Sequence, residues 1–442
     1  PAPAGAAAAD STPPLAAVPG SAAGSRHASA LAATSGPPPA PGSAGASGPA
    51  AGSPPAPPGA LAGDLGPRGG QAVEGRSVRG VPGTVEGYRA LARGRLGGEV
   101  WDFFEGGAES ERTVGDNRRA FGRVTLRPRV LVDVSRCDTA VEVLGARLRT
   151  PVGVAPTAYH RLAHPDGEVA TAQGAGAAGA LFVVSIYASR TIEDVAAAAT
   201  SPWWLQLYWL RRRDILADLV ARAAAAGCGA VVLTVDAPRL GRRHRDARNG
   251  FALGPGIRAA NLDSAVTASA HLPAAGRSAL AAHAVEAVDP SVTWSDLAWL
   301  RARSDLPLVL KGVLTAQDAA LAVDHGADAV VVSNHGGRQL DRAPATLDAL
   351  AEVVAAVGGA IPVLLDGGVR GGTDAFAALA LGARAVLLGR PALWGLAAGG
   401  AAGVAGVLDL ATEELAHTMA LAGRPDLASI DGSAVRLRAE AR

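Results

Sequence analysis

The stretch "AVVVSNHGGRQLD", residues 329–341, holds the pattern that decides the fold. Four apolar residues run directly into a polar segment that contains Ser333, His335, two glycines and Arg338. An apolar run without polar alternation is typical of a strand buried on both faces, as in a parallel sheet. The abrupt change to groups that donate, accept and move protons indicates that this strand ends at a functional site.

Seven further runs of the same kind recur along the chain, and Ala/Leu-rich segments with helical spacing separate them. With 329–333, the runs are 151–156, 181–185, 203–207, 230–235, 307–311, 361–366 and 385–389. Eight such units predict a (β/α)8 TIM barrel, although the periodicity alone is also compatible with a doubly wound open sheet. Two helices are expected before the first unit, at 85–96 and 98–110.

Composition restricts the function classes. The chain has 442 residues, of which 49% are apolar, and a formal net charge of +1, so neither nucleic acid nor an anionic membrane is expected as a partner. Its two cysteines, Cys137 and Cys228, stand in no metal-binding or redox spacing, which fits a reducing cytosol. No uninterrupted apolar run is long enough to span a bilayer. We therefore expect a cytoplasmic protein.

The first 80 residues differ from the remainder because they consist mainly of Pro, Ala, Gly and Ser. Such a segment buries too little apolar area to offset its conformational entropy, so we predict a disordered extension at 1–80 and a barrel domain at 81–442. An Ala/Gly/Pro-rich insertion at about 252–290 is too long for an ordinary connection and predicts a lid.

Nearly every predicted strand ends in a hydrogen-bonding or ionisable group. In a (β/α)8 barrel the active site is built from the carboxyl ends of the strands and the loops that follow them. The convergence of these groups on one rim predicts a site there. The residues are Thr157, Ser185, Gln206, Tyr208, Thr234, Asp236, Lys311, Ser333, His335, Asp366, Gly389 and Arg390.

The last two strand ends predict a phosphate site. The segments "DGGVRGG" (366–372) and "GRP" (389–391) combine glycine amides with Arg370 and Arg390, which suit an anion. Barrels of this class often bind phosphate at these two loops, so a phosphate-bearing cofactor is expected.

From Thr84 to the carboxyl terminus, the sequence resembles the FMN-dependent 2-hydroxy-acid oxidases and dehydrogenases, a family that includes glycolate oxidase, lactate oxidase and mandelate dehydrogenase. The resemblance rests on 333–341 and on matching stretches elsewhere. These are "APTA" (155–158), "QLY" (206–208), "TVDAPRLGRR" (234–243), "LKG" (310–312) and "LDGGVRGGTD" (365–374). Within the family, "WLRR" (209–212) and "RNGFAL" (248–253) are most similar to p-hydroxymandelate oxidases.

The resemblance implies an FMN enzyme that oxidises an (S)-2-hydroxy acid to the 2-oxo acid, with dioxygen as acceptor and hydrogen peroxide as product. A dehydrogenase linked to a quinone or a protein carrier, or a lactate monooxygenase, remains an alternative within the family. A non-catalytic flavin-binding barrel and a flavin-dependent isomerase remain alternatives of other classes. The family also implies a homo-oligomer, a tetramer or an octamer.

Five residues are predicted to act on the substrate. A neutral imidazole accepts a proton near pH 7, so His335 is the candidate base, whether it takes the α-proton or the hydroxyl proton. By resemblance, Arg243 and Arg338 hold the substrate carboxylate, which a guanidinium binds in a bidentate manner; solvated surface charge is the alternative for Arg243, which only its position in the matched motif distinguishes from Arg242. By resemblance, Asp236 stabilises protonated His335 and Tyr208 donates to the substrate. Asp236 as a turn cap and Tyr208 as part of the barrel wall remain the structural alternatives.

The remaining candidates are predicted to hold FMN. Lys311 ends an apolar strand, where a cation is costly without an anion, and the resemblance sets it at the edge of the flavin ring; a structural salt bridge is the alternative. By resemblance, the ring is held by Pro156, Thr157, Ala158, Ser185, Gln206 and Thr234. The ribityl chain is held by Ser333 and Asp366, and the phosphate by Gly367, Gly368, Arg370, Gly389 and Arg390.

One position departs from the family pattern. Members carry a tyrosine in an early motif that donates to the substrate carboxylate, and this sequence has Phe103 there. A phenyl ring makes the pocket more apolar, which favours an aromatic or bulky 2-hydroxy acid over glycolate. Tyr187, which follows Ser185 by two residues, supports the same preference. The insertion lacks large apolar and aromatic residues, so no membrane-binding segment is expected there.

Overall fold

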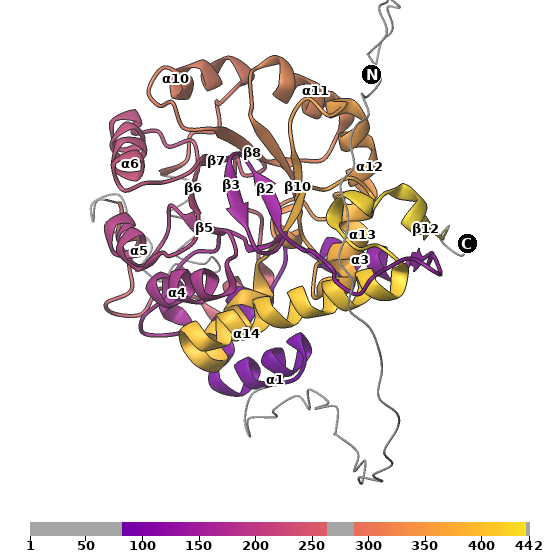
Figure 1. Ribbon diagram of the computed structural model, residues 1–442. Helices are drawn as coiled ribbons and strands as arrows, with labels where there is room; N and C mark the ends of the chain where they lie inside the picture. Colours follow the sequence, from indigo (N-terminus) through magenta and orange to yellow (C-terminus); the bar gives the residue numbers. More distant parts are fainter. Residues whose placement is uncertain (1–81, 263–286, 439–442) are drawn as a thin grey trace, which may run out of the picture. The chain divides into compact units, whose positions relative to one another are not determined.

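The computed structural model describes residues 82–262 and 287–438 (Figure 1). The chain divides into two units, Pro1–Glu74 and Gly75–Arg442, and every described residue belongs to the second. The predicted extension at 1–80 lies outside the described residues, as does most of the predicted lid insertion.

Eight parallel strands close into a barrel in the order β10-β11-β4-β5-β6-β7-β8-β9, which confirms the predicted fold. Proline shortens two of the predicted runs, since Pro156 and Pro362 have no N–H to donate to a neighbouring strand. The strands are β4 (Val152–Val154), β5 (Phe182–Ser185), β6 (Trp203–Leu207), β7 (Val231–Thr234), β8 (Leu308–Val313), β9 (Ala329–Val332), β10 (Val363–Asp366) and β11 (Ala385–Leu388).

Apolar side chains fill the inside of the barrel, and a hairpin closes one end of it. Val183, Val309 and Leu364 pack there together with residues of β2 (Val141–Val143) and β3 (Ala146–Leu148). The hairpin reaches the amino ends of the strands, because the Glu142 carbonyl accepts from the Arg384 side chain just before β11. The hairpin leaves the carboxyl ends of the strands uncovered.

Helices surround the barrel (Figure 1). Both expected early helices are present, although the second, expected at 98–110, ends at Glu105 before two glycines. An antiparallel pair, β1 (Val124–Leu126) with β12 (Val435–Leu437), joins the segment after the third helix to the carboxyl end of the described chain. The helices are α1 (Val85–Arg95), α2 (Gly98–Glu105), α3 (Arg112–Gly122), α4 (Glu168–Ala178), α5 (Ile192–Ala198), α6 (Arg213–Ala225), α7 (His244–Asn249), α10 (Leu297–Arg301), α11 (Ala316–Asp324), α12 (Thr346–Val357), α13 (Gly372–Ala380) and α14 (Arg390–Ala422).

Helix α14 is the longest of the described helices, and by length and composition it could cross a membrane. However, 61% of its most apolar window is buried inside the protein. It packs against α1, α4 and α13, and it departs from helical geometry at Gly399 and Gly400. Its apolar composition is thus explained by its place in the core.

Candidate active site

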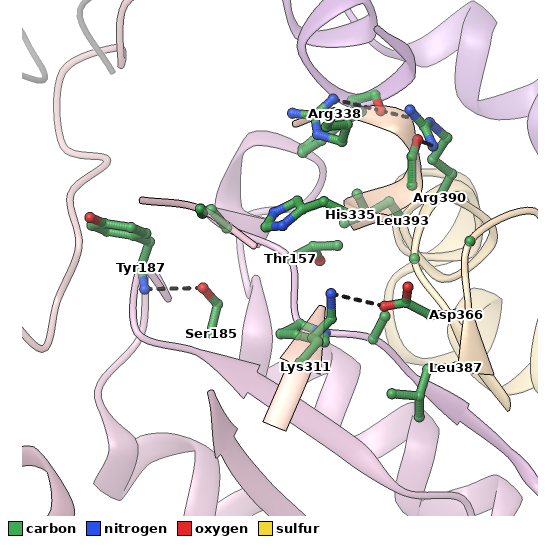
Figure 2. A pocket seen from close by; sticks show the side chains of 18 of the residues that line it. Thr157, Ser185, Tyr187, Lys311, His335, Arg338, Asp366, Leu387, Arg390 and Leu393 are labelled. Carbon is green, nitrogen blue, oxygen red and sulfur yellow. Dashed lines mark hydrogen bonds and ion pairs between the residues drawn. The ribbon is translucent and has the colours of Figure 1, made fainter. Parts of the chain in front are cut away.

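A cleft opens at the carboxyl ends of the barrel strands, and it gathers the predicted site residues (Figure 2). Four of the predicted residues lie directly behind the wall: Gln206, Asp236 and Ser333 hydrogen-bond to residues that line it, and Thr234 accepts from Gln206. Those that line the cleft are Pro156, Thr157, Ala158, Ser185, Tyr208, Arg243, Lys311, His335, Arg338, Asp366, Gly367, Gly368, Arg370, Gly389 and Arg390.

His335 forms the centre of a three-residue arrangement. Its Nδ1 lies 3.0 Å from Asp236 Oδ1, and its Nε2 lies 3.4 Å from the Tyr208 hydroxyl. The backbone of His335 is left-handed, with φ of 57°, and its N–H donates to Ser333 Oγ at 3.1 Å. This conformation is rare for a residue other than glycine, and the surrounding bonds hold it in place.

The protonation states of the pair follow from burial and charge. Burial lowers the pKa of the His335 imidazole, and the Asp236 carboxylate partly offsets that effect. Burial acts to raise the pKa of Asp236, but the His335 ring and Lys311 outweigh it and hold that pKa below its ordinary value. Near neutral pH, a neutral imidazole therefore faces an ionised carboxylate, which is the state that a general base requires.

The glycine of the "LKG" stretch makes room for Asp236. Gly312 sits at an irregularity of β8 with φ of 115°, and a Cβ there would lie 2.6 Å from the Asp236 Cβ. Any side chain at Gly312 would displace the carboxylate from His335. The glycine is thus needed both for backbone conformation and for close approach.

Lys311 is a buried cation with two partners. Its Nζ lies 3.1 Å from Asp366 Oδ2 and donates to Ser333 Oγ at 2.8 Å. An unpaired ammonium at this depth would cost several kcal/mol, and the carboxylate offsets much of that. The other oxygen, Asp366 Oδ1, is buried and finds no hydrogen-bond partner among the described residues. That oxygen suits a hydroxyl donor of a bound molecule.

A chain of side-chain hydrogen bonds crosses three adjacent strands beside the cleft. Ser185 Oγ donates to Gln206 Oε1 at 3.2 Å, and Gln206 Nε2 donates to Thr234 Oγ1 at 2.9 Å. The Tyr187 N–H donates to Ser185 Oγ at 3.1 Å (Figure 2). These bonds fix the orientation of the Gln206 amide, which suits recognition of a flat ring with a polar edge.

Two arginines make one side of the cleft strongly positive. Burial lowers the pKa of Arg243, and burial together with Arg243 and Arg390 holds the pKa of Arg338 well below its ordinary value. Within the described ranges, the buried Arg243 Nε has no hydrogen-bond partner. Because burial disfavours the charged form of both guanidinium groups, a bound anion stabilises them. The planar geometry of a guanidinium favours a carboxylate as that anion.

A third arginine marks the phosphate end of the cleft. Burial and the nearby charges of Arg390 and Arg118 lower the pKa of Arg370 to about 9. Its Nη1 donates to the Val369 carbonyl at 2.9 Å, and no carboxylate of the described chain forms an ion pair with it. Together with the orphaned Asp366 Oδ1, these contacts fit a cofactor that carries a phosphate and a hydroxylated chain, as FMN does.

Arg390 lines the cleft, but its guanidinium donates to main-chain carbonyls of Phe104, Glu105, Gly106 and Gly336. Its assignment to a phosphate stays a prediction. Sequence reasoning also missed these carbonyls, because a carbonyl leaves no signal in residue identity. The only indication was the "EGG" that ends the expected helix at 98–110.

Two further residues were missed. Tyr159 follows "APTA" with φ of 57° and lines the cleft, and its buried hydroxyl has no hydrogen-bond partner in the described part of the chain. Asp246 lies in α7, one helical turn after Arg243, and burial raises its pKa. The proximity of Asp246 to Arg243 in the sequence was the available signal.

The comparisons with known proteins agree on one family. The model of the FMN-dependent dehydrogenase family matches residues 92–437. A peroxisomal (S)-2-hydroxyacid oxidase of Arabidopsis thaliana is 47% identical over 81% of this chain and 97% of its own. An L-lactate oxidase of a Nostoc species is 50% identical over 79% of this chain and 97% of its own length. A solved structure of mandelate oxidase with (S)-4-hydroxymandelic acid has a TM-score of 0.77 and 45% sequence identity. The match covers 80% of this chain and 98% of the mandelate oxidase chain.

Substituting Asp236 should change the titration of His335. The Asp236 charge raises the pKa of the imidazole, so Asp236→Asn should lower that pKa further below its ordinary value. The ring-proton NMR shifts of His335, followed against pH, measure this. Asp324→Asn, in an exposed residue of α11, is the control and should leave the titration of His335 unchanged. An equal or higher His335 pKa in Asp236→Asn would show that the pair is not coupled as described.

Proposed function

This chain belongs to the FMN-dependent dehydrogenase family, and we propose that its cleft oxidises an (S)-2-hydroxy acid to the 2-oxo acid with dioxygen as acceptor. It is an FMN-dependent 2-hydroxy-acid oxidase, an oxidoreductase that acts on CH–OH groups. The observation that carries the mechanism is His335, which Asp236 contacts from behind the wall of the cleft. His335 lines this cleft with Arg243 and Arg338, two arginines that form no ion pair with a carboxylate among the described residues.

The reaction removes two electrons and two protons from the substrate. Bound FMN would supply the two-electron acceptor, and dioxygen with two protons would take these electrons to give hydrogen peroxide. The chain supplies the proton chemistry: His335 accepts a substrate proton, and Asp236 at 3.0 Å stabilises the imidazolium that forms. Asp236 also holds the ring so that Nε2 faces the cleft and the Tyr208 hydroxyl.

The substrate is held by its carboxylate. Arg243 and Arg338 bind the two oxygens, and Tyr208 donates a hydrogen bond beside His335. Burial raises the pKa of the Tyr208 hydroxyl, which therefore stays protonated and can donate. Lys311, Gln206 and Thr234 would hold the polar edge of the flavin ring, and Arg370 with Gly367 and Gly368 its phosphate.

The substrate that we propose carries an aromatic ring. Phe103 is buried, stacks on Phe251 at 4.5 Å between ring centroids, and lies under the Arg338 guanidinium at 5.3 Å. The cleft is also lined by Phe104 and by Tyr159, Tyr187 and Tyr208. A wall with this many rings favours an apolar, aromatic side group. The structural similarity to a mandelate oxidase supports the same proposal.

We also propose a cytoplasmic homotetramer. Both cysteines are free, which suits a reducing compartment, although the plant relatives are named peroxisomal. Val130 and Leu131 are 81% and 104% exposed, and adjacent exposed apolar side chains favour an interface between copies. Light scattering on the eluting protein should give four times the monomer mass of 44.0 kDa. A monomer at micromolar concentration would contradict the proposal.

Anaerobic reduction tests the activity directly. The purified yellow protein should lose its visible absorbance with (S)-mandelate and regain it in air, with 2-oxo acid and hydrogen peroxide as products. His335→Asn should keep the flavin but reduce it at least about a hundredfold more slowly, as expected when a general base is lost. His417→Asn, on the exposed face of α14, is the matched control. Retained fast reduction in His335→Asn would contradict the base assignment.

The products separate the alternatives within the family. If a quinone but not air restores the visible absorbance after bleaching, the protein is a dehydrogenase. Release of the decarboxylated acid would indicate a monooxygenase. A yellow protein that neither (S)-mandelate nor L-lactate bleaches would overturn the proposed function.

Phe103→Tyr should shift the preference toward small substrates. A new hydroxyl can donate to the substrate carboxylate, and a hydrogen bond to a charged acceptor contributes about 1.5–3 kcal/mol, or about tenfold or more. Both acids carry this carboxylate, so kcat/KM should rise for both, but the hydroxyl also makes the pocket less apolar. The ratio of kcat/KM for L-lactate to that for (S)-mandelate should therefore rise. Phe251→Tyr, in the stacked ring behind Phe103, should leave the ratio unchanged. An unchanged ratio in Phe103→Tyr would remove the argument for an aromatic substrate.

A further inference from the structure

The carboxyl end of helix α2 binds two arginines at once. The carbonyls of Phe104 and Gly106 accept from Arg390 at 3.1 and 3.0 Å. The same two carbonyls accept from Arg338 Nη1 at 3.4 and 2.7 Å. The last carbonyls of a helix have no partner within the helix, and its dipole favours cations there. Two like charges are thus held side by side through shared acceptors.

The guanidinium of Arg390 uses all three of its nitrogens on protein carbonyls. In addition to the two shared acceptors, Nη2 donates to Glu105 at 3.2 Å and Nη1 donates to Gly336 at 3.0 Å. The residue is 9% exposed. Arg370 differs, because its guanidinium donates, within the described chain, only to the neighbouring Val369 carbonyl, while its main-chain N–H donates to Asp374 Oδ2. Arg370, and not Arg390, keeps donors for a phosphate.

The acceptors themselves are fixed. Glu105 Oε1 accepts from Trp394 Nε1 at 2.8 Å, and Glu105 Oε2 accepts from Arg89 at 3.3 Å. These bonds attach the end of α2 to α14 and α1. A guanidinium bound to this end is therefore held at a defined position relative to the barrel.

The fourth bond of Arg390 reaches the turn that carries His335. Gly336 has φ of 63°, and a Cβ on it would lie 3.0 Å from Arg390 Nη1. The close approach of Arg390 thus requires a glycine directly after the catalytic histidine. Arg338 follows the same turn, so Arg390 supports both ends of the segment 335–338.

We propose that Arg390 is a positioning residue for the substrate carboxylate, acting through Arg338 and the 335–338 turn, and that it does not bind the cofactor phosphate with its side chain. The inference rests on the proposed function, since it assumes that Arg338 binds a carboxylate. Losing Arg390 frees the carbonyls of Phe104 and Gly106 and leaves Arg338 as their only cation among the described residues. Arg338 then turns toward the helix end and away from the cleft.

The test compares Arg390→Met with Arg370→Met and uses binding alone. Phenylacetate, a carboxylate that cannot be oxidised at a hydroxyl, is titrated into the FMN-loaded protein and followed by the visible flavin spectrum. Arg390→Met should weaken phenylacetate about tenfold or more, as expected for a lost charged hydrogen-bond network, and change FMN affinity less than threefold. Arg370→Met should do the opposite. Loss of FMN in Arg390→Met with unchanged phenylacetate affinity would overturn the proposal.

Two further variants identify the route. In Arg338→Met, adding Arg390→Met should weaken phenylacetate by less than a further twofold, because both act through one guanidinium. Independent, multiplicative losses would contradict action through Arg338. Arg390→Lys keeps the charge but cannot reach the carbonyls of α2 and Gly336 together, so it should bind FMN normally and still lose phenylacetate affinity. If Arg390→Met does not fold, Arg390→Lys still tests the proposed role of Arg390. Normal phenylacetate binding by Arg390→Lys would overturn the proposal.

Failure of the proposed function gives a different result. If the unsubstituted, FMN-loaded protein does not bind phenylacetate at all, the carboxylate site is wrong, and the inference falls with it. If it binds phenylacetate but (S)-mandelate and L-lactate do not bleach it, the positioning role of Arg390 can stand while the oxidase activity fails.

Discussion

Closure of a parallel barrel forces the carboxyl ends of its strands to meet at one rim, and the site depends on this constraint. Thr157 and Arg390 are far apart in sequence, yet both line one cleft because β4 and β11 are neighbours in the closed sheet. The apolar interior and the hairpin β2–β3 close the opposite end. Polar groups that would be costly inside the barrel therefore lie only where the strands stop.

Charge at this rim determines what can bind there. Lys311 and His335 each face a carboxylate, and Arg338 and Arg390 share the carbonyls of a helix end. The Arg370 guanidinium has only the neighbouring carbonyl of Val369 as a hydrogen-bond partner among the described residues. Burial lowers the pKa of Arg338, Arg370 and Arg390, so the cleft gains from bound anions. The phosphate of FMN at one end of the cleft and the carboxylate of a 2-hydroxy acid at the other would be two such anions.

Much of this arrangement could be predicted from the sequence, because strand ends and side-chain chemistry are both visible in residue identity. The eight apolar runs became the eight barrel strands, and the predicted rim residues lie in or directly behind one cleft. The sequence could not reveal that Arg390 points to the end of α2, since its partners are main-chain carbonyls from a segment almost 300 residues away. Nor could it pair Phe103 with Phe251, because that contact depends on how α2 meets the residues after α7.

The substitution at Phe103 and the arginine arrangement belong to one argument. A tyrosine there would share the task of binding the carboxylate, whereas a phenyl ring cannot donate a hydrogen bond. The Phe103 ring instead packs against the Arg338 guanidinium, whose Cζ lies 5.3 Å from the ring centroid. This cation–π contact strengthens when water is excluded. In the proposed function the carboxylate is bound by Arg243, Arg338 and Tyr208, so an error in the placement of Arg338 is more costly. The carbonyls of Phe104 and Gly106, which follow Phe103 closely in the chain, hold the Arg338 guanidinium in place. They thereby compensate for the absence of a hydroxyl group at position 103.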